Sequence, residues 1–123
     1  MAIDTSIVVQ ALSSIRSAVV NDEYNLHNTV ADHLAAAAIP FKREYKLGPR
    51  NRIDFLIENG IGIEVKKGKQ NKAAVLQQVE RYARCEETTA IILVSEYNLQ
   101  LPKLVNGKEC ITIFLNRLWG IAL

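Results

Sequence analysis

Residues 52–67 place two acids and a lysine inside two strongly apolar strands. The segment reads Arg-Ile-Asp-Phe-Leu-Ile-Glu-Asn-Gly-Ile-Gly-Ile-Glu-Val-Lys-Lys. Its Asn59-Gly60 dipeptide is typical of a β-hairpin turn, and the flanking β-branched and aromatic residues are typical of strands. Burying a charge among such residues is costly unless the charge is paired or binds a metal. The hairpin therefore constrains both the fold of this chain and the place of its chemistry.

The length of the turn decides which residues of the hairpin face each other. A two-residue loop divides the apolar residues between both faces, whereas a three-residue loop with Gly60 as a left-handed bulge gathers them on one face. We therefore predict a three-residue loop over residues 58–60. The apolar pairs are then Ile57 with Ile61, Phe55 with Ile63, and Ile53 with Val65. On the other face, Asp54 lies directly opposite Glu64.

Two like charges placed opposite each other destabilise a ribbon, and a divalent cation between them reverses that effect. We therefore predict a metal site formed by Asp54 and Glu64, with the ammonium group of Lys66 close by. Carboxylate oxygens suit Mg²⁺ or Mn²⁺ rather than Zn²⁺, and they leave positions for water and phosphate oxygens. The alternative is an ordinary hairpin with a surface Asp–Lys or Glu–Lys ion pair, which contributes little stability.

Asp54, followed by Glu64-x-Lys66 on the next strand, resembles the motif of the PD-(D/E)XK nuclease superfamily. The resemblance extends over about residues 23–115, and Ile53 stands where the motif has proline. It implies a restriction endonuclease-like core of helix, three antiparallel strands, helix and strand, here preceded by an extra N-terminal helix. It also implies hydrolysis of DNA phosphodiesters with Mg²⁺, for which Mn²⁺ can substitute. Lys66 would act at the nucleophilic water, and the Val65 carbonyl would be a third metal ligand.

Two further residues are candidates by the same resemblance. Members of the superfamily often carry an acid on the helix before the sheet that reaches the metal site, and Glu23 resembles that acid. The alternative for Glu23 is a first-turn glutamate that the helix dipole favours. Gln78 stands four residues before Tyr82. This spacing resembles an extension of the motif in several branches of the superfamily, where the helix that carries it flanks the active site. Gln78 would then orient a water or a phosphate.

Basic residues are concentrated around the motif. Residues 42–72 contain nine Lys or Arg against four Asp or Glu, whereas the whole chain has a net charge of only +2. A basic segment around a pair of carboxylates matches the phosphate backbone of a nucleic acid. A solubilising loop is the alternative, and it explains one or two of these lysines. The candidate nucleic-acid-binding residues are Arg50, Arg52, Lys67, Lys69, Lys72 and Arg81.

The rest of the chain predicts a single domain over residues 1–123, of the α/β class, with a mixed central sheet flanked by helices. Apolar periodicity indicates helices over residues 5–20, 22–38 and 71–85, and strands over residues 41–47, 88–95 and 110–115. The apolar strand after the third helix indicates a crossover parallel to the second strand of the hairpin. Residues 97–108 indicate a short helix or a loop, and Trp119 is expected in the core.

Composition places the chain among ordinary globular proteins, with 49% hydrophobic and 23% charged residues. We expect no membrane span, because no apolar run approaches about 20 residues. Two cysteines without metal-type spacing favour the cytoplasm over a disulfide scaffold. Together these features predict a structure-selective DNA endonuclease that acts as a homodimer, the dimer being an analogy with small junction-resolving members of the superfamily. The alternatives are a non-catalytic nucleic-acid-binding or assembly module that retains the fold, and a phage or mobile-element protein that acts on RNA or as a partner subunit.

Overall fold

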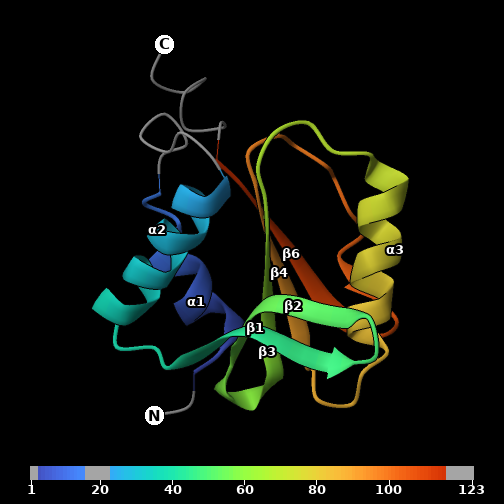
Figure 1. Ribbon diagram of the computed structural model, residues 1–123, viewed down its shortest axis with the longest axis horizontal. Coiled ribbons are helices and arrows are strands. Elements are labelled where there is room, and N and C mark those ends of the chain that lie inside the picture. The colour runs from blue at the N-terminus through green and yellow to red at the C-terminus, as the bar shows by residue number, and fades with distance from the viewer. Residues whose placement is uncertain (1–2, 16–22, 116–123) are drawn as a thin grey trace.

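A six-stranded mixed sheet with helices on both faces forms the protein (Figure 1). The computed structural model describes residues 3–15 and 23–115, without the side chains of residues 23 and 24. The helices in this part of the chain are α1 (Thr5–Leu12), α2 (Glu23–Ala36) and α3 (Lys72–Ala83). The strands are β1 (Phe41–Gly48), β2 (Asn51–Ile57), β3 (Ile61–Lys66), β4 (Ala90–Ser95), β5 (Leu104–Val105) and β6 (Lys108–Phe114).

The sheet has the strand order β1-β2-β3-β4-β6-β5. The first three strands pair antiparallel, and β4 lies parallel to both β3 and β6. Helix α3 makes the crossover between β3 and β4, because parallel neighbours cannot be joined by a tight turn. The predicted α/β class and mixed sheet are confirmed. The prediction for residues 97–108 missed one element, since Leu104–Val105 forms the short strand β5 against β6.

The core is divided into two layers by the sheet. Helices α1 and α2 cover one face and α3 covers the other (Figure 1). On the first face, Leu12 and Leu34 pack with Phe55 and Ile63 in one buried cluster. On the second face, the cluster contains Val75, Val79, Tyr82 and Leu93. A polar group placed between β2 and β3 is therefore enclosed by a helix on either side.

The helix boundaries follow local capping signals. The Asp4 side chain accepts a hydrogen bond from the Ile7 N–H at 3.0 Å and begins α1. This helix ends at Leu12, earlier than predicted, because Ser13 and Ser14 favour local hydrogen bonding over helix continuation. Residues 16–20 of the predicted helix lie outside the described residues, as does Trp119. Helix α3 begins after Asn71, whose side chain accepts from the Ala74 N–H at 3.0 Å.

The β2–β3 turn has the predicted three residues, Glu58–Gly60. Its left-handed residues are Asn59 and Gly60, with φ values of 78° and 85°. A Cβ atom at Gly60 would lie 2.2 Å from the Glu87 carbonyl oxygen, so glycine is required there. The expected register follows from this turn, since Phe55 pairs with Ile63.

The alternation of β2 is broken at Asp54, which the sequence did not predict. Phe55 packs under α1 and α2, whereas Ile53 packs in the α3 cluster, so the predicted pairing of Ile53 with Val65 on one apolar face is wrong. Strand β1 changes face at the same level. Its Phe41 packs on the α1–α2 side and its Tyr45 on the α3 side. The residue of β1 opposite Asp54 is Glu44, which has a φ of 50°.

Candidate active site

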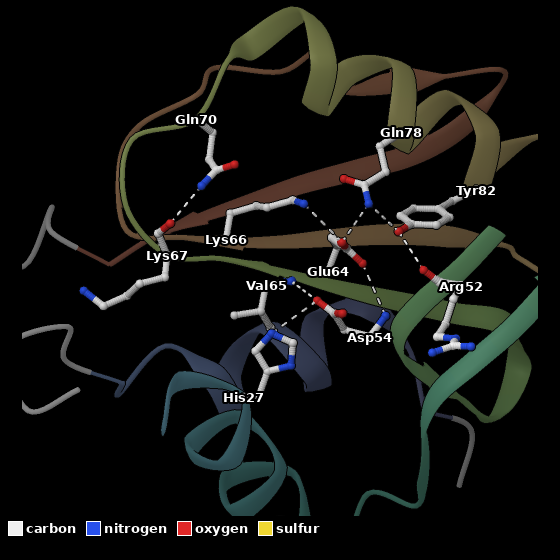
Figure 2. A network of polar contacts seen from close by, with 10 residues as sticks. All are labelled: His27, Arg52, Asp54, Glu64, Val65, Lys66, Lys67, Gln70, Gln78 and Tyr82. Carbon is white, nitrogen blue, oxygen red and sulfur yellow. Dashed lines mark hydrogen bonds and ion pairs between the residues drawn. The ribbon is translucent and has the colours of Figure 1, made fainter. Parts of the chain in front are cut away.

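The two acids of the motif meet where β2 and β3 separate. Beyond the pair Phe55–Ile63, side chains replace the backbone ladder between these strands. The Val65 N–H donates to Asp54 Oδ2 at 2.8 Å, and the Asp54 N–H donates to Glu64 Oε1 at 3.3 Å. Each acid thus bonds the backbone of the opposite strand, and the two carboxylates lie beside each other between α2 and α3 (Figure 2).

The acids approach from opposite sides and do not share one face as predicted. Asp54 Oδ2 lies 3.7 Å from His27 Nε2 on α2, whereas Glu64 Oε2 accepts from Gln78 Nε2 of α3 at 3.0 Å. The reason is the break at Asp54. Its carboxylate accepts a hydrogen bond from the Val65 N–H within the sheet, so it does not stand above the ribbon.

Glu64 is nearly enclosed, with 4% of its surface exposed. Lys66 Nζ lies 3.3 Å from Glu64 Oε2, the same oxygen that Gln78 bonds. Burial, together with the charge of Asp54, raises the pKa of Glu64 to about 7, and the Lys66 charge opposes this shift. Two carboxylates are therefore held in mutual repulsion, with one lysine beside them.

Gln78 is oriented by a tyrosine one helical turn further along α3. Its Nε2 donates to Tyr82 Oη at 2.8 Å as well as to Glu64, and the Tyr82 hydroxyl donates to the Arg52 carbonyl at 2.9 Å. Burial raises the pKa of Tyr82, which therefore stays a hydrogen-bond donor. This chain of bonds fixes α3 to β2 and sets the position of the Glu64 carboxylate. Gln78 is thus engaged with protein groups, and its predicted role toward water or phosphate remains a prediction.

Asp54 has a different environment from Glu64. Its side chain is 15% exposed, and burial raises its pKa although the Val65 N–H and the His27 charge lower it. The charge of Glu44 adds to the increase. His27, Glu44 and Asp54 each offer one ligand atom, and these three atoms lie within 4.8 Å of one another. His27 and Glu44 are absent from the predicted site. The signal available for Glu44 was its position in a strand that pairs with β2.

The predicted basic residues fall into three places. Lys67 points away from the acids (Figure 2), and its Nζ pairs with Glu96 at 2.5 Å. Lys69 and Lys72 are exposed at the start of α3. The remaining predicted residues, Arg50, Arg52 and Arg81, are exposed near the β1–β2 turn.

The group near the β1–β2 turn borders a shallow hollow. Lys46, Arg50, Asn51 and Arg52 line it. The Asn51 side chain donates to the Arg81 carbonyl at 3.4 Å, which brings the end of α3 to the same place. The side chain of Glu23 lies outside the described residues, so its predicted approach to the metal site stays a prediction.

Comparison with known proteins leaves the site to be interpreted from its own geometry. No family model, curated protein or solved structure matches the chain. Within residues 3–15 and 23–115, none of the helices has the length and apolar character needed to cross a membrane. The fold defines an α/β protein, and the site defines a buried acid–lysine cluster at a strand junction.

Proposed function

We propose that this chain is a metal-dependent nuclease of the PD-(D/E)XK kind that hydrolyses DNA phosphodiester bonds. One observation carries the proposal. Asp54 and Glu64 come from neighbouring strands and meet where those strands separate, and Lys66 reaches the same point. A fold needs a reason to hold two carboxylates together in a partly buried position, because their repulsion is costly there. Binding of a divalent cation is such a reason.

The donor set fits Mg²⁺ or Mn²⁺. Carboxylate oxygens are the ligands that these ions prefer. Burial and the charge of Asp54 together raise the pKa of Glu64 to about 7, and a bound cation would offset both effects. Asp54 and Glu64 would hold the ion, with the Val65 carbonyl as a third ligand. When bound, the ion would supply a Lewis acid for the phosphodiester and a water of lowered pKa.

The protein groups around the acids have separable roles. Lys66 carries a positive charge beside Glu64, and next to a scissile phosphate it would stabilise the negative charge that develops during hydrolysis. Gln78 positions Glu64, because Tyr82 fixes the direction of its amide. Gln78 is therefore a positioning residue in this proposal.

DNA is the proposed substrate because exposed basic side chains lie near both ends of α3, the helix that carries Gln78 beside Glu64. Arg50, Arg52 and Arg81 lie near the β1–β2 turn, and Lys69 and Lys72 lie at the start of α3. Such groups bind phosphates without reading sequence. A small domain of this kind suits recognition of DNA shape, and a homodimer would present two sites to two strands. We therefore propose a structure-selective endonuclease that acts as a homodimer.

A non-catalytic nucleic-acid-binding module is the second candidate. The observation that favours it is the set of partners of Glu64. Its Oε2 already pairs with the Lys66 ammonium group and accepts a hydrogen bond from Gln78. A carboxylate satisfied in this way can serve as a structural link between β3 and α3. Such a module would bind nucleic acid through its basic residues and would leave phosphodiesters intact.

A cleavage assay separates the two candidates. The protein is incubated with Mg²⁺ or Mn²⁺ and with linear duplexes, single strands, flaps and four-way junctions of DNA, and with matched RNA. We expect metal-dependent cutting of DNA that is lost in Glu64→Ala and Lys66→Ala. Equal cutting by wild type and Glu64→Ala would refute the assignment of the site, and binding of every substrate without cutting would favour the module.

Matched controls exclude trivial losses of activity. Glu58→Ala removes an exposed acid from the hairpin turn, and Lys103→Ala removes an exposed lysine far along the chain. Both variants should cut as the wild type does. Circular dichroism and urea unfolding of all variants show whether a loss of cutting reflects a loss of fold.

A further inference from the structure

A second group of ligand-bearing side chains lies on the α2 side of Asp54. His27 comes from α2, Glu44 from β1 and Asp54 from β2, and one ligand atom of each lies within 4.8 Å of the others. Within this group, His27 Nε2 lies 3.7 Å from Asp54 Oδ2. Atoms bound to one ion at about 2.2 Å lie at most about 4.4 Å apart, so only a small movement of side chains would complete such a site.

The position of Glu44 is set by the pairing of β1 with β2. The pairs Arg43–Phe55 and Tyr45–Ile53 flank it, so Glu44 faces Asp54 across the strands. Like charges in this arrangement destabilise a sheet. Among the described residues, Glu44 forms no ion pair with a lysine or arginine. Its carboxylate therefore adds negative charge to a place where Asp54 is already partly buried.

The donor atoms of this group differ from those of the Asp54–Glu64 pair. An imidazole nitrogen suits first-row transition metals, whereas Mg²⁺ favours an all-oxygen set. Two carboxylate oxygens and one imidazole nitrogen together suit Mn²⁺, which accepts both kinds of ligand. We propose that His27, Glu44 and Asp54 form a second cation position, which takes a transition-metal ion such as Mn²⁺ in preference to Mg²⁺.

This position shares Asp54 with the Asp54–Glu64 pair but lies on the other side of the strand junction. The inference concerns binding of an ion and does not require that the chain cuts DNA. It is therefore tested without nucleic acid, and failure of the nuclease proposal leaves its test unaffected.

Metal titration of the tag-free protein tests the second position. Mn²⁺ binding is followed by electron paramagnetic resonance of the free ion and by calorimetry. We expect two Mn²⁺ ions per wild-type chain, and Glu44→Gln should weaken one of them by about tenfold or more. Glu44 is exposed, so its replacement should leave the fold intact. The matched control is Glu58→Gln, an exposed glutamate in the β2–β3 turn.

The two metal positions can be told apart by a second variant. Glu64→Gln removes the other acid and should leave the Glu44-dependent ion in place. The proposal would be overturned if Glu44→Gln bound two Mn²⁺ ions with the affinities of wild type. It would also be overturned if wild type bound a single Mn²⁺ ion whose affinity Glu44→Gln did not change. Competition in which Mg²⁺ displaces the Glu44-dependent Mn²⁺ at equal concentration would overturn the proposed preference.

A local readout assigns the ion to the imidazole. Substoichiometric Mn²⁺ should broaden the ring signals of His27 in nuclear magnetic resonance spectra more than those of His33. His33 lies on the same helix, where its Nδ1 is bonded to the Thr29 carbonyl at 2.9 Å, so it serves as an internal control. Equal broadening of both histidines, or sharp His27 signals beside bound Mn²⁺, would contradict the assignment.

Discussion

The acidic side chains on the two sides of the β2–β3 junction have different surroundings. On the α3 side, Glu64 pairs with the Lys66 ammonium group and accepts a hydrogen bond from Gln78. The hydrogen bond from Tyr82 to the Arg52 carbonyl fixes that arrangement to β2. On the α2 side, Asp54 and Glu44 face each other beside one imidazole. The first side is closed and hydrogen-bonded, and the second brings like charges together.

A metal site has to hold its acids in place and to attract a cation, and the two sides of the junction divide these tasks between them. A fixed network keeps an acid in one place, because each buried polar group in it has a partner. A group of carboxylates with unbalanced charge favours binding of a cation. Asp54 belongs to both sides, since it bonds Val65 within the sheet and lies beside Glu44.

The largest expected effect follows from the shared position of Asp54. Asp54→Asn keeps an acceptor for the Val65 N–H but removes a charge from both sides. We expect metal-dependent cutting to fall by about a hundredfold or more and both Mn²⁺ positions to weaken. Single-turnover cleavage and metal titration measure the two effects. Loss of only one metal position in Asp54→Asn would show that the two sides do not share this acid.

The pH dependence of stability tests the α3 side. Because the pKa of Glu64 rises from 4.5 to about 7 on folding, the folded chain binds more protons than the unfolded chain between these values. Stability in metal-free buffer should therefore fall, by roughly 1 to 3 kcal/mol, as the pH rises through this range. Urea unfolding at several pH values measures it. Glu64→Gln should flatten the curve, and an equally steep curve in that variant would contradict the assignment.

Removal of one hydroxyl tests how firmly the α3 side is held. Tyr82→Phe takes the donor from the Arg52 carbonyl and the acceptor from Gln78, and both hydrogen bonds are partly buried. We expect a loss of about 1 to 3 kcal/mol in the free energy of unfolding. Tyr97→Phe is the matched control, because Tyr97 is 44% exposed. A Tyr82→Phe protein as stable as the control would show that the network does not hold α3.

The smallest effect is expected on the α2 side. Glu44→Gln removes a like charge opposite Asp54 and should stabilise the metal-free protein by up to about 0.5 kcal/mol. The gain should reverse when Mn²⁺ is present, because wild type then binds an ion that the variant binds weakly. Thermal unfolding with and without Mn²⁺ measures both differences. A destabilised metal-free variant would mean that Glu44 supports the fold directly.

Part of this arrangement could be predicted because it depends on local signals. The dipeptide Asn59-Gly60 indicated the place of the turn, the apolar pattern indicated its three-residue length, and that length set the pairing of Phe55 with Ile63. The resemblance of the Gln78-x-x-x-Tyr82 spacing to a superfamily motif predicted Gln78 beside the site, and Gln78 contacts Glu64 there. In each case, neighbours along the chain carry the information.

The rest could not be predicted because it depends on contacts between distant segments. A two-residue alternation placed Ile53 with Phe55, but the hydrogen bond from the Val65 N–H to Asp54 breaks that alternation. The approach of His27 to Asp54 needs the packing of α2, which a strand pattern does not contain. The pairing of β1 with β2 indicates the place of Glu44, but not the change of face in β1.

The missing side chain at Gly62 has a consequence for anyone who wishes to redesign this protein. A Cβ atom there would lie 2.4 Å from Cδ1 of Ile53, the neighbour of Asp54 in the chain. The space above Gly62 is therefore occupied by the Ile53 side chain, which packs in the α3-side cluster. A methyl group added at Gly62 would displace the Ile53 side chain without altering any charge, so the packing beside Asp54 could be varied by steric means alone.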